Sequence, residues 1–226
     1  MKALFLSILL LSLTACATER QRHLPELTAI GDARRATACE SIFPRGHWQF
    51  AHAIDFSMQD GSGGTVIGVT SLSEDEIACA LMTIEGLTLF EAVSKKGEGL
   101  EVRRAVAPFN KPAFAEGLMA DVRAIFLPPA AINIRHGWLD NNVPVCRYTG
   151  IDGRTTDILP ATDDCWQIKT YTSELVMDRS IVGYSCQKKE NSLIPEHLEL
   201  KGFTNSGYTL KMTLIHAENL TRKTLP

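Results

Sequence analysis

The sequence predicts a mostly β protein with one inserted helix, and three observations lead to that fold class. From His47 to Met58, apolar side chains alternate with polar ones, which is the period of two that a half-buried β-strand shows. Several further strand-length segments follow without a helical pattern between them, which indicates antiparallel hairpins in series. Residues 112–127 instead place apolar side chains at helical spacing.

The first strand is followed by a turn-rich segment at residues 59–64 and then by a meander. The apolar face of that first strand carries Trp48, Phe50, Ile54, Phe56 and Met58. Before the helix, further strands are expected at 65–72, 77–83, 87–93 and 100–106. After the helix, strands are expected at 143–149, 155–159, 166–171, 180–186, 197–201 and 208–217.

The helix at 112–127 has clear start and stop signals. Pro112 suits the first turn, and Pro128 with Pro129 ends the helix. The apolar side chains at helical spacing are Phe114, Leu118, Val122, Ile125 and Phe126. The polar residues Glu116, Asp121 and Arg123 are expected on the other faces.

The N-terminal segment has the pattern of an export signal. Lys2 precedes an uncharged apolar run, Ala3 to Leu13, which is too short to span a bilayer. The Leu13-Thr-Ala-Cys16 ending resembles a bacterial lipobox, in which the cysteine thiol receives diacylglycerol before cleavage. A cysteine placed by chance after a signal peptide is the alternative.

The lipobox interpretation divides the chain into three parts. Residues 1–15 are the signal peptide, residues 16–38 are the lipidated Cys16 and a polar tether with a short helix near 32–40, and residues 39–226 are the domain. Two or more acyl chains anchor a protein stably to a membrane. Ala17 at the second mature position resembles outer-membrane lipoproteins, so we expect a lipid-anchored protein of the cell envelope that faces the periplasm.

Composition excludes several classes of partner. The net charge is −3, and no cluster of Lys and Arg indicates a nucleic-acid partner. Five cysteines remain besides Cys16, so an oxidising compartment predicts one or two disulfides and one unpaired thiol. If the strands at 166–171 and 180–186 form a hairpin, Cys165 and Cys186 lie opposite each other. No Cys-x-x-Cys is present to suggest zinc.

The catalytic candidates are weak. His47 and His52 point to opposite faces of one strand, and His52, on the apolar face, is expected in the core. Arg103 and Arg104 are either a surface pair or a pair with one inward side chain that could hold a lipid head group. No hydrolase or phosphate-binding motif is present. We expect no enzyme activity, no cofactor and no metal site.

Four local patterns resemble the outer-membrane lipoprotein receptor LolB and its periplasmic relative LolA. They are Trp48-x-Phe50, a strand pair centred on Gly86, Trp166-Gln-Ile-Lys-Thr-Tyr171 and Pro195-x-x-Leu-x-Leu200. The resemblance covers residues 45–217 and implies an unclosed antiparallel half-barrel with a helical lid over an apolar cavity. Residues 82–87 are the nearest match to the protruding apolar loop of LolB, and residues 176–191 depart from the LolB pattern.

A narrower resemblance is to an uncharacterised family of small LolB-like lipoproteins found beside genes for envelope-lipid or polyene biosynthesis. The segments that carry it are Leu81-Met-Thr-Ile-Glu-Gly86, Leu89-Phe-Glu-Ala92, Arg103-Arg-Ala-Val106, Pro108-Phe109 and Ala115-Glu-Gly-Leu118. This likeness implies a lipid-related setting without a demonstrated activity.

Two functions follow as expectations. The first is a carrier that binds acyl chains of lipids or lipoproteins, with a possible periplasmic carrier protein as partner. Its cavity would be lined by Trp48, Phe50, Phe56, Phe90, Phe114, Leu118, Val122, Phe126, Leu210 and Met212. The second is a structural or interaction lipoprotein of an envelope assembly, in which the same side chains fill an ordinary core.

Overall fold

The computed structural model describes residues 23–29, 39, 41–140, 142–160, 165–190, 192–203 and 207–221. The signal peptide, Cys16 and most of the short helix expected near 32–40 lie outside the described residues. Within the described part, no helix has the length and apolar character needed to cross a bilayer.

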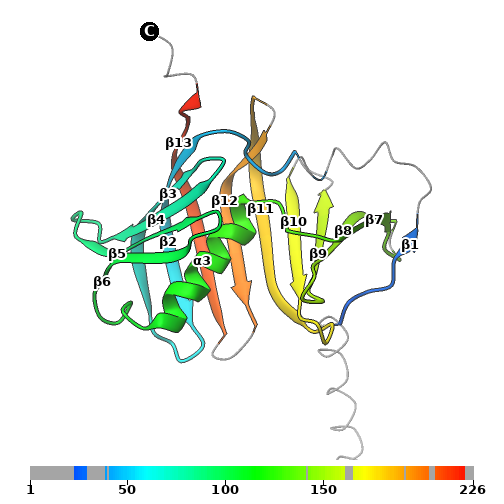
Figure 1. The fold of residues 1–226 in the computed structure, drawn as a ribbon, viewed down its shortest axis with the longest axis horizontal. Helices are drawn as coiled ribbons and strands as arrows, with labels where there is room; N and C mark the ends of the chain where they lie inside the picture. Colours follow the sequence, from blue (N-terminus) through cyan, green and yellow to red (C-terminus); the bar gives the residue numbers. More distant parts are fainter. Residues whose placement is uncertain are drawn as a thin grey trace, which may run out of the picture.

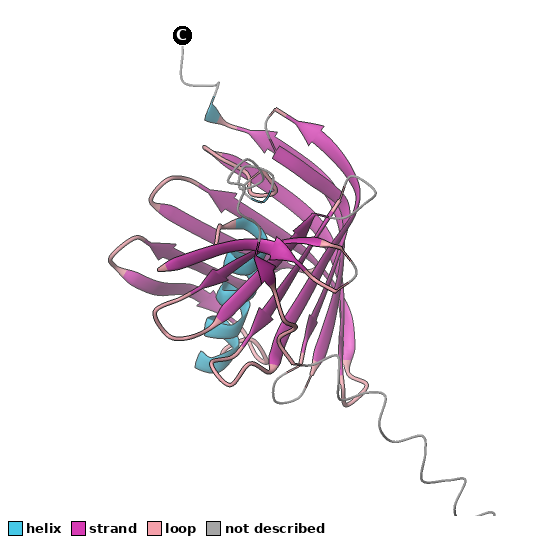
Figure 2. Cartoon of the chain, turned by 90° about the vertical axis from the view of Figure 1, so that its right-hand side faces the viewer, coloured by secondary structure: helices cyan, strands magenta, loops and turns pink. Residues whose placement is uncertain are grey.

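Thirteen antiparallel strands form one sheet in the order β1-β7-β8-β9-β10-β11-β12-β13-β2-β3-β4-β5-β6. The order starts at β1 and ends at β6, so the sheet does not close into a barrel. Figures 1 and 2 show it as an open, strongly curved surface. The strands before the helix are β1 (Thr28–Ala29), β2 (Trp48–Met58), β3 (Gly63–Leu72), β4 (Glu76–Met82), β5 (Thr88–Lys95) and β6 (Gly99–Ala105). The later strands are β7 (Asn133–Trp138), β8 (Pro144–Thr149), β9 (Thr155–Pro160), β10 (Trp166–Tyr171), β11 (Met177–Lys189), β12 (Ser192–Gly202) and β13 (Tyr208–Asn219).

The predicted fold class is confirmed, and each strand that the pattern predicted is present. β11 and β12 are longer than expected, and β11 occupies most of the segment 176–191 that departs from the LolB pattern. β1 and β7 were not predicted. The sequence of β7, Asn-Ile-Arg-His-Gly-Trp, has no regular alternation, because most of its side chains are exposed near the sheet edge.

The helix α3 (Pro112–Phe126) has Pro112 in its first turn, as predicted. It lies on the concave side of the sheet, where Figure 1 shows it crossing the central strands. Its buried residues are Ala115, Met119, Asp121, Val122, Ile125 and Phe126. These side chains join those of the sheet in one hydrophobic core.

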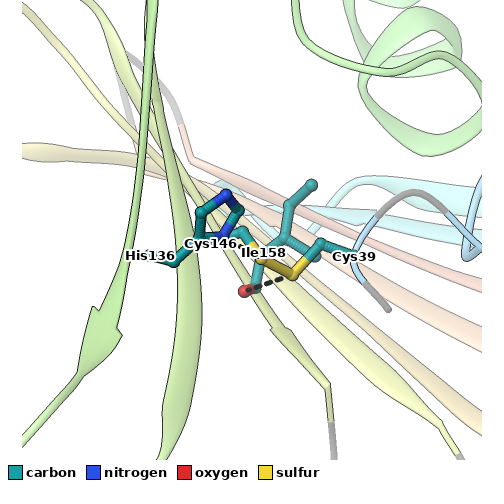
Figure 3. The surroundings of a disulfide bond; sticks show 4 residues. All are labelled: Cys39, His136, Cys146 and Ile158. Carbon is teal, nitrogen blue, oxygen red and sulfur yellow. Dashed lines mark hydrogen bonds between the residues drawn. A yellow bond between two sulfur atoms is a disulfide. The ribbon is translucent and has the colours of Figure 1, made fainter. Parts of the chain in front are cut away.

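Two disulfides connect distant parts of this core. Cys165 and Cys186 are bonded to each other, which is the pair that the hairpin hypothesis placed opposite one another. Cys39 is bonded to Cys146, 107 residues away. Figure 3 shows the Cys39–Cys146 disulfide together with its neighbours Ile158 and His136. The Nδ1 atom of His136 lies 3.2 Å from the Cys146 sulfur. Cys79 is the free, buried thiol among the described cysteines.

Residues 23–29, which the lipobox interpretation assigns to the tether, lie against the domain. β1 pairs with β7, and the backbone N–H of Leu24 donates to the carbonyl of Leu175, 3.0 Å away. The carbonyl of Pro25 accepts a hydrogen bond from Arg147, whose guanidinium is fully buried and bonded at 2.7 Å to both carboxylate oxygens of Asp157. This segment therefore covers a buried ion pair of β8 and β9.

The two disulfides are expected to contribute unequally to stability. A cross-link restricts the unfolded chain more when it closes a longer loop, and the separations are 107 and 21 residues. Replacing Cys39 and Cys146 by alanine is expected to lower the free energy of unfolding by roughly 1 kcal/mol more than replacing Cys165 and Cys186. Urea unfolding of the two double variants measures this difference. Equal losses would contradict the loop-length explanation.

Candidate functional site

The candidate site is the region between α3 and the concave face of the sheet. All ten residues predicted to line a cavity lie in or against this core. Six of them are buried, namely Trp48, Phe50, Phe90, Val122, Phe126 and Met212. The other four are partly buried and pack on that cluster, namely Phe56, Phe114, Leu118 and Leu210. All ten therefore belong to the hydrophobic core around α3, and their role in binding a ligand stays a prediction.

Aromatic rings fill the space at both ends of α3. Near its C-terminal end, the Phe126 ring stacks on Phe50 at a centroid distance of 4.9 Å, and Phe50 stacks on Trp48 at 5.5 Å. Near its N-terminal end, the Phe114 ring meets Phe90 edge-on at 5.7 Å. Such pairs contribute about 0.5–1.5 kcal/mol each beyond the area they bury. The helix is thus packed on the sheet along its length.

The space that remains beside Phe50 and Phe126 is small. A cavity of about 10 Å³ is lined by Ile42, Pro44, Phe50, His52, Ile125, Phe126, Trp166, Leu193, Ile194, Pro195 and Leu198. This volume is about that needed for one water molecule. An acyl chain does not fit there, so side chains of the protein fill this part of the expected cavity in this conformation.

A buried polar cluster holds the middle of α3. Asp121 Oδ1 lies 2.7 Å from Nε of Arg179 on β11. The hydroxyl of Tyr208 on β13 donates to the same carboxylate, at 2.8 and 2.7 Å from its two oxygens. Burial raises the pKa of Asp121, while the charge of Arg179 and the Tyr208 hydrogen bond act in the opposite direction. We call Asp121, Arg179 and Tyr208 the polar clamp.

The polar clamp depends on a glycine between its two strands. Gly202 on β12 pairs with Arg179 on one side and with Tyr208 on the other. A Cβ at Gly202 would collide with the Tyr208 ring. The absence of a side chain therefore lets this ring lie over β12, where its hydroxyl reaches Asp121. A second polar contact, from Arg123 to the Ser94 hydroxyl, joins α3 to β5.

The placement of Asp121 corrects the expectation from helical spacing, which put it away from the inner face of the helix. Its side chain is buried. A signal was available, because Asp121 lies three residues after Leu118 and four before Ile125, which is the spacing of the apolar stripe. A carboxylate inside an apolar stripe indicates a buried partner of opposite charge.

The other candidates do not converge on a site. His52 is buried beside Phe50 and Phe126, as expected, and His47 is exposed. Arg103 and Arg104 are both exposed, and Arg103 pairs with Glu91 and Glu101. Among the residues that the structure describes, no group of three His, Cys, Asp or Glu side chains is arranged to hold a metal ion.

Loss of the Asp121 carboxylate charge is expected to destabilise the protein. Asp121→Asn keeps the shape of the side chain but leaves the largely buried Arg179 with only the longer contact, 3.9 Å, to Asp178, which costs about 3 kcal/mol. Glu116→Gln on the exposed side of α3 is the matched control, with an expected change below about 0.5 kcal/mol. Chemical unfolding of both variants measures these values. Similar losses in both would refute a clamp role for Asp121.

His52 is expected to make stability depend on pH. Burial lowers the pKa of His52 from 6.5 to about 4, so the unfolded chain takes up the proton first as pH falls. The stability that neutral His52 contributes is complete above pH 6.5 and is lost between pH 6.5 and 4, with about 2–3 kcal/mol gone near the lower limit. His52→Leu should remove this part of the pH profile, as measured by urea unfolding at several pH values. An unchanged profile would show that His52 does not cause it.

Comparisons with known proteins identify the fold. No family model and no curated protein sequence matches this chain. Among the solved structures that are similar to this chain are the following two, each of which aligns over most of both chains. A LolA superfamily protein from Nitrosomonas europaea has a TM-score of 0.55 at 11% identity, over 84% of this chain and 92% of that one. A domain assigned to outer-membrane lipoprotein sorting, from Vibrio parahaemolyticus, has a TM-score of 0.52 at 7% identity, over 83% and 91%. The chain thus has a LolA-like fold, an open half-barrel with a helix on its concave face.

Proposed function

We propose that this protein is a lipid-anchored lipoprotein of the outer membrane, facing the periplasm, that takes up acyl chains of lipids or lipoproteins between α3 and the sheet. The lipobox around Cys16 supports the anchor. The LolA-like fold supports a carrier rather than an enzyme. The narrower resemblance to small LolB-like lipoproteins supports a role in envelope-lipid transfer, with a periplasmic carrier protein as the delivering partner.

The observation that carries this proposal is how α3 is held. The helix covers the apolar concave face through side chains, and none of its backbone groups belongs to a strand ladder. It can therefore move off the sheet without breaking strand pairing. Its release breaks side-chain contacts and no hydrogen bond between strands. Because the sheet is not closed, the interior can widen when the helix moves.

The energetics suit a carrier whose resting interior is filled. Burying an acyl chain of ~15 methylenes gains about 12 kcal/mol relative to water. A membrane or another carrier supplies the chain, so most of that gain cancels on transfer. Opening must then cost little, and the polar clamp allows this, because hydration of Asp121 and Arg179 on opening offsets most of the Coulomb attraction that is lost. Met119 and the Phe side chains can rearrange around a flexible ligand.

A second function is favoured by the small volume of the cavity. An interior with about 10 Å³ of free space beside α3 also suits a packed subunit of an envelope assembly with no ligand site. In that case α3 is a permanent part of the core. The two proposals differ in whether the helix moves.

The native thiol of Cys79 allows a direct test of helix movement. Its sulfur lies 3.3 Å from that of Met119 on α3. In Met119→Cys the new sulfur is one bond closer to the helix, so it faces Cys79 from α3, and the loss of two hydrogens in the mass confirms that the bond has formed. Made in an unlipidated Cys16→Ser chain, the variant is cross-linked by mild oxidation, and binding of a fluorescent fatty acid is then measured. The cross-linked protein is expected to lose binding, because α3 is fixed to β4.

The control is Met119→Cys combined with Cys79→Ala, which has no partner thiol and should bind the probe after the same oxidation. Equal binding by the cross-linked and control proteins would refute uptake beneath α3. Absence of binding in the parent Cys16→Ser protein, together with a lipid-free mass in native mass spectrometry, would favour the packed subunit.

A further inference from the structure

The N-terminal segment reaches the domain at one end of the sheet. His23 forms a bridge with Val176 in the turn between β10 and β11, next to the bond from Leu24 to Leu175. In Figure 1 the blue segment descends from β1 to this turn. The point at which the chain from Cys16 joins the domain is therefore fixed.

The same end of the sheet exposes aliphatic side chains. In an antiparallel sheet, alternate turns lie at the same end, so the β8–β9 and β10–β11 turns are neighbours. Gly153 lies close to Ser173, which shows this directly. These turns and the segment leading into β7 expose Ile132, Ile151, Leu175 and Val176, whose exposed fractions are 72%, 89%, 44% and 37%. We call these four residues the aliphatic rim.

Charges beside the aliphatic rim are largely compensated within the protein. Arg154 in the β8–β9 turn lies 3.6 Å from Asp152 and 3.2 Å from Asp178. Glu174 is exposed, and its negative charge disfavours binding to a strongly anionic membrane. An aliphatic patch with little net charge fits the interface of a zwitterionic bilayer, where apolar groups enter to a depth of about 5–10 Å.

The opposite end of the sheet differs in chemistry. The turns there include Ser73-Glu-Asp75 and Lys96-Gly-Glu98, which contain no large apolar side chain. The β8–β9 and β10–β11 turns differ from these two turns in exposing Ile151, Leu175 and Val176. Insertion into a membrane is therefore favoured at the aliphatic rim over these two charged turns.

The length of chain between Cys16 and His23 limits how far the aliphatic rim can lie from that membrane. Seven residues span at most about 25 Å when fully extended. Because His23 bridges to Val176, which belongs to the rim, the rim stays within that distance of the bilayer surface that holds Cys16. The β3–β4 and β5–β6 turns, which we call the charged end, have no such direct link to the anchor.

From this we infer that the aliphatic rim is a membrane-docking surface, which inserts Ile151 and its neighbours into the lipid interface and orients the domain with its strands rising from the membrane. The inference rests on the lipid anchor of the proposed function. It adds a second contact with the same membrane. Its partner is the surface of a zwitterionic bilayer.

Depth-dependent quenching tests this orientation in the lipidated full-length mature protein, after its mass has confirmed the attached lipid. Ile151→Trp and, as a second rim variant, Ile132→Trp are placed in phosphatidylcholine vesicles brominated near the head-group end of the acyl chains. Glu74→Trp, at the charged end, is the matched control. The wild-type signal of the three native tryptophans is subtracted.

Quenching of both rim variants is expected to be at least about twofold stronger than that of Glu74→Trp, because bromine and the indole occupy the same depth. Equal quenching of rim and control variants in vesicle-bound protein would overturn the inference while leaving the lipid anchor intact. A mature protein without attached lipid would overturn the anchor, and this inference with it.

Discussion

The structure depends on covering the apolar concave face of an open sheet. Strands β2, β4, β5, β12 and β13 direct large side chains to that face, and a sheet that does not close on itself cannot bury them alone. The helix α3 covers them, with Phe126 against Phe50 at one end and Phe114 against Phe90 at the other. Its position is specified further by the polar clamp, which has directional contacts that apolar packing lacks. Apolar packing buries the helix face, and the contacts of Asp121 with Arg179 and Tyr208 determine where along the sheet the helix lies.

Local patterns in the sequence account for much of this arrangement. Alternation along β2 and helical spacing in α3 are strong periodic signals, so both elements were predicted correctly, while the buried face of α3 also includes Met119 and Asp121, which were not expected there. β7 was missed because its side chains lie mostly in solvent and follow no period. The contacts of residues 23–29 were missed because they depend on Arg147 and Asp157, more than 100 residues away. The burial of Arg147 and Asp157 cannot be inferred from the residues beside them in the sequence.

In the candidate site too, some features follow from local sequence patterns and others depend on distant residues. Periodicity indicated which apolar side chains join the core around α3, but the space left among them depends on their rotamers and on the curvature of the sheet. Neither can be obtained from a pattern of residue types. The position of Asp121 was recoverable from its spacing to Leu118 and Ile125, whereas its partner Arg179 belongs to a strand 58 positions later. The contact that restrains the helix is thus non-local.

The place of β13 in the sheet has a consequence for how the chain acquires its structure. This strand comes last in the chain, yet it lies between β12 and β2 and joins the part of the sheet built before it from residues 48–105 to the part built from residues 133–202. The two parts can pair into one sheet only through residues 208–219. Completion of the sheet therefore depends on the last strand of the chain, and a chain that lacks it has two unpaired strand edges in place of a continuous sheet.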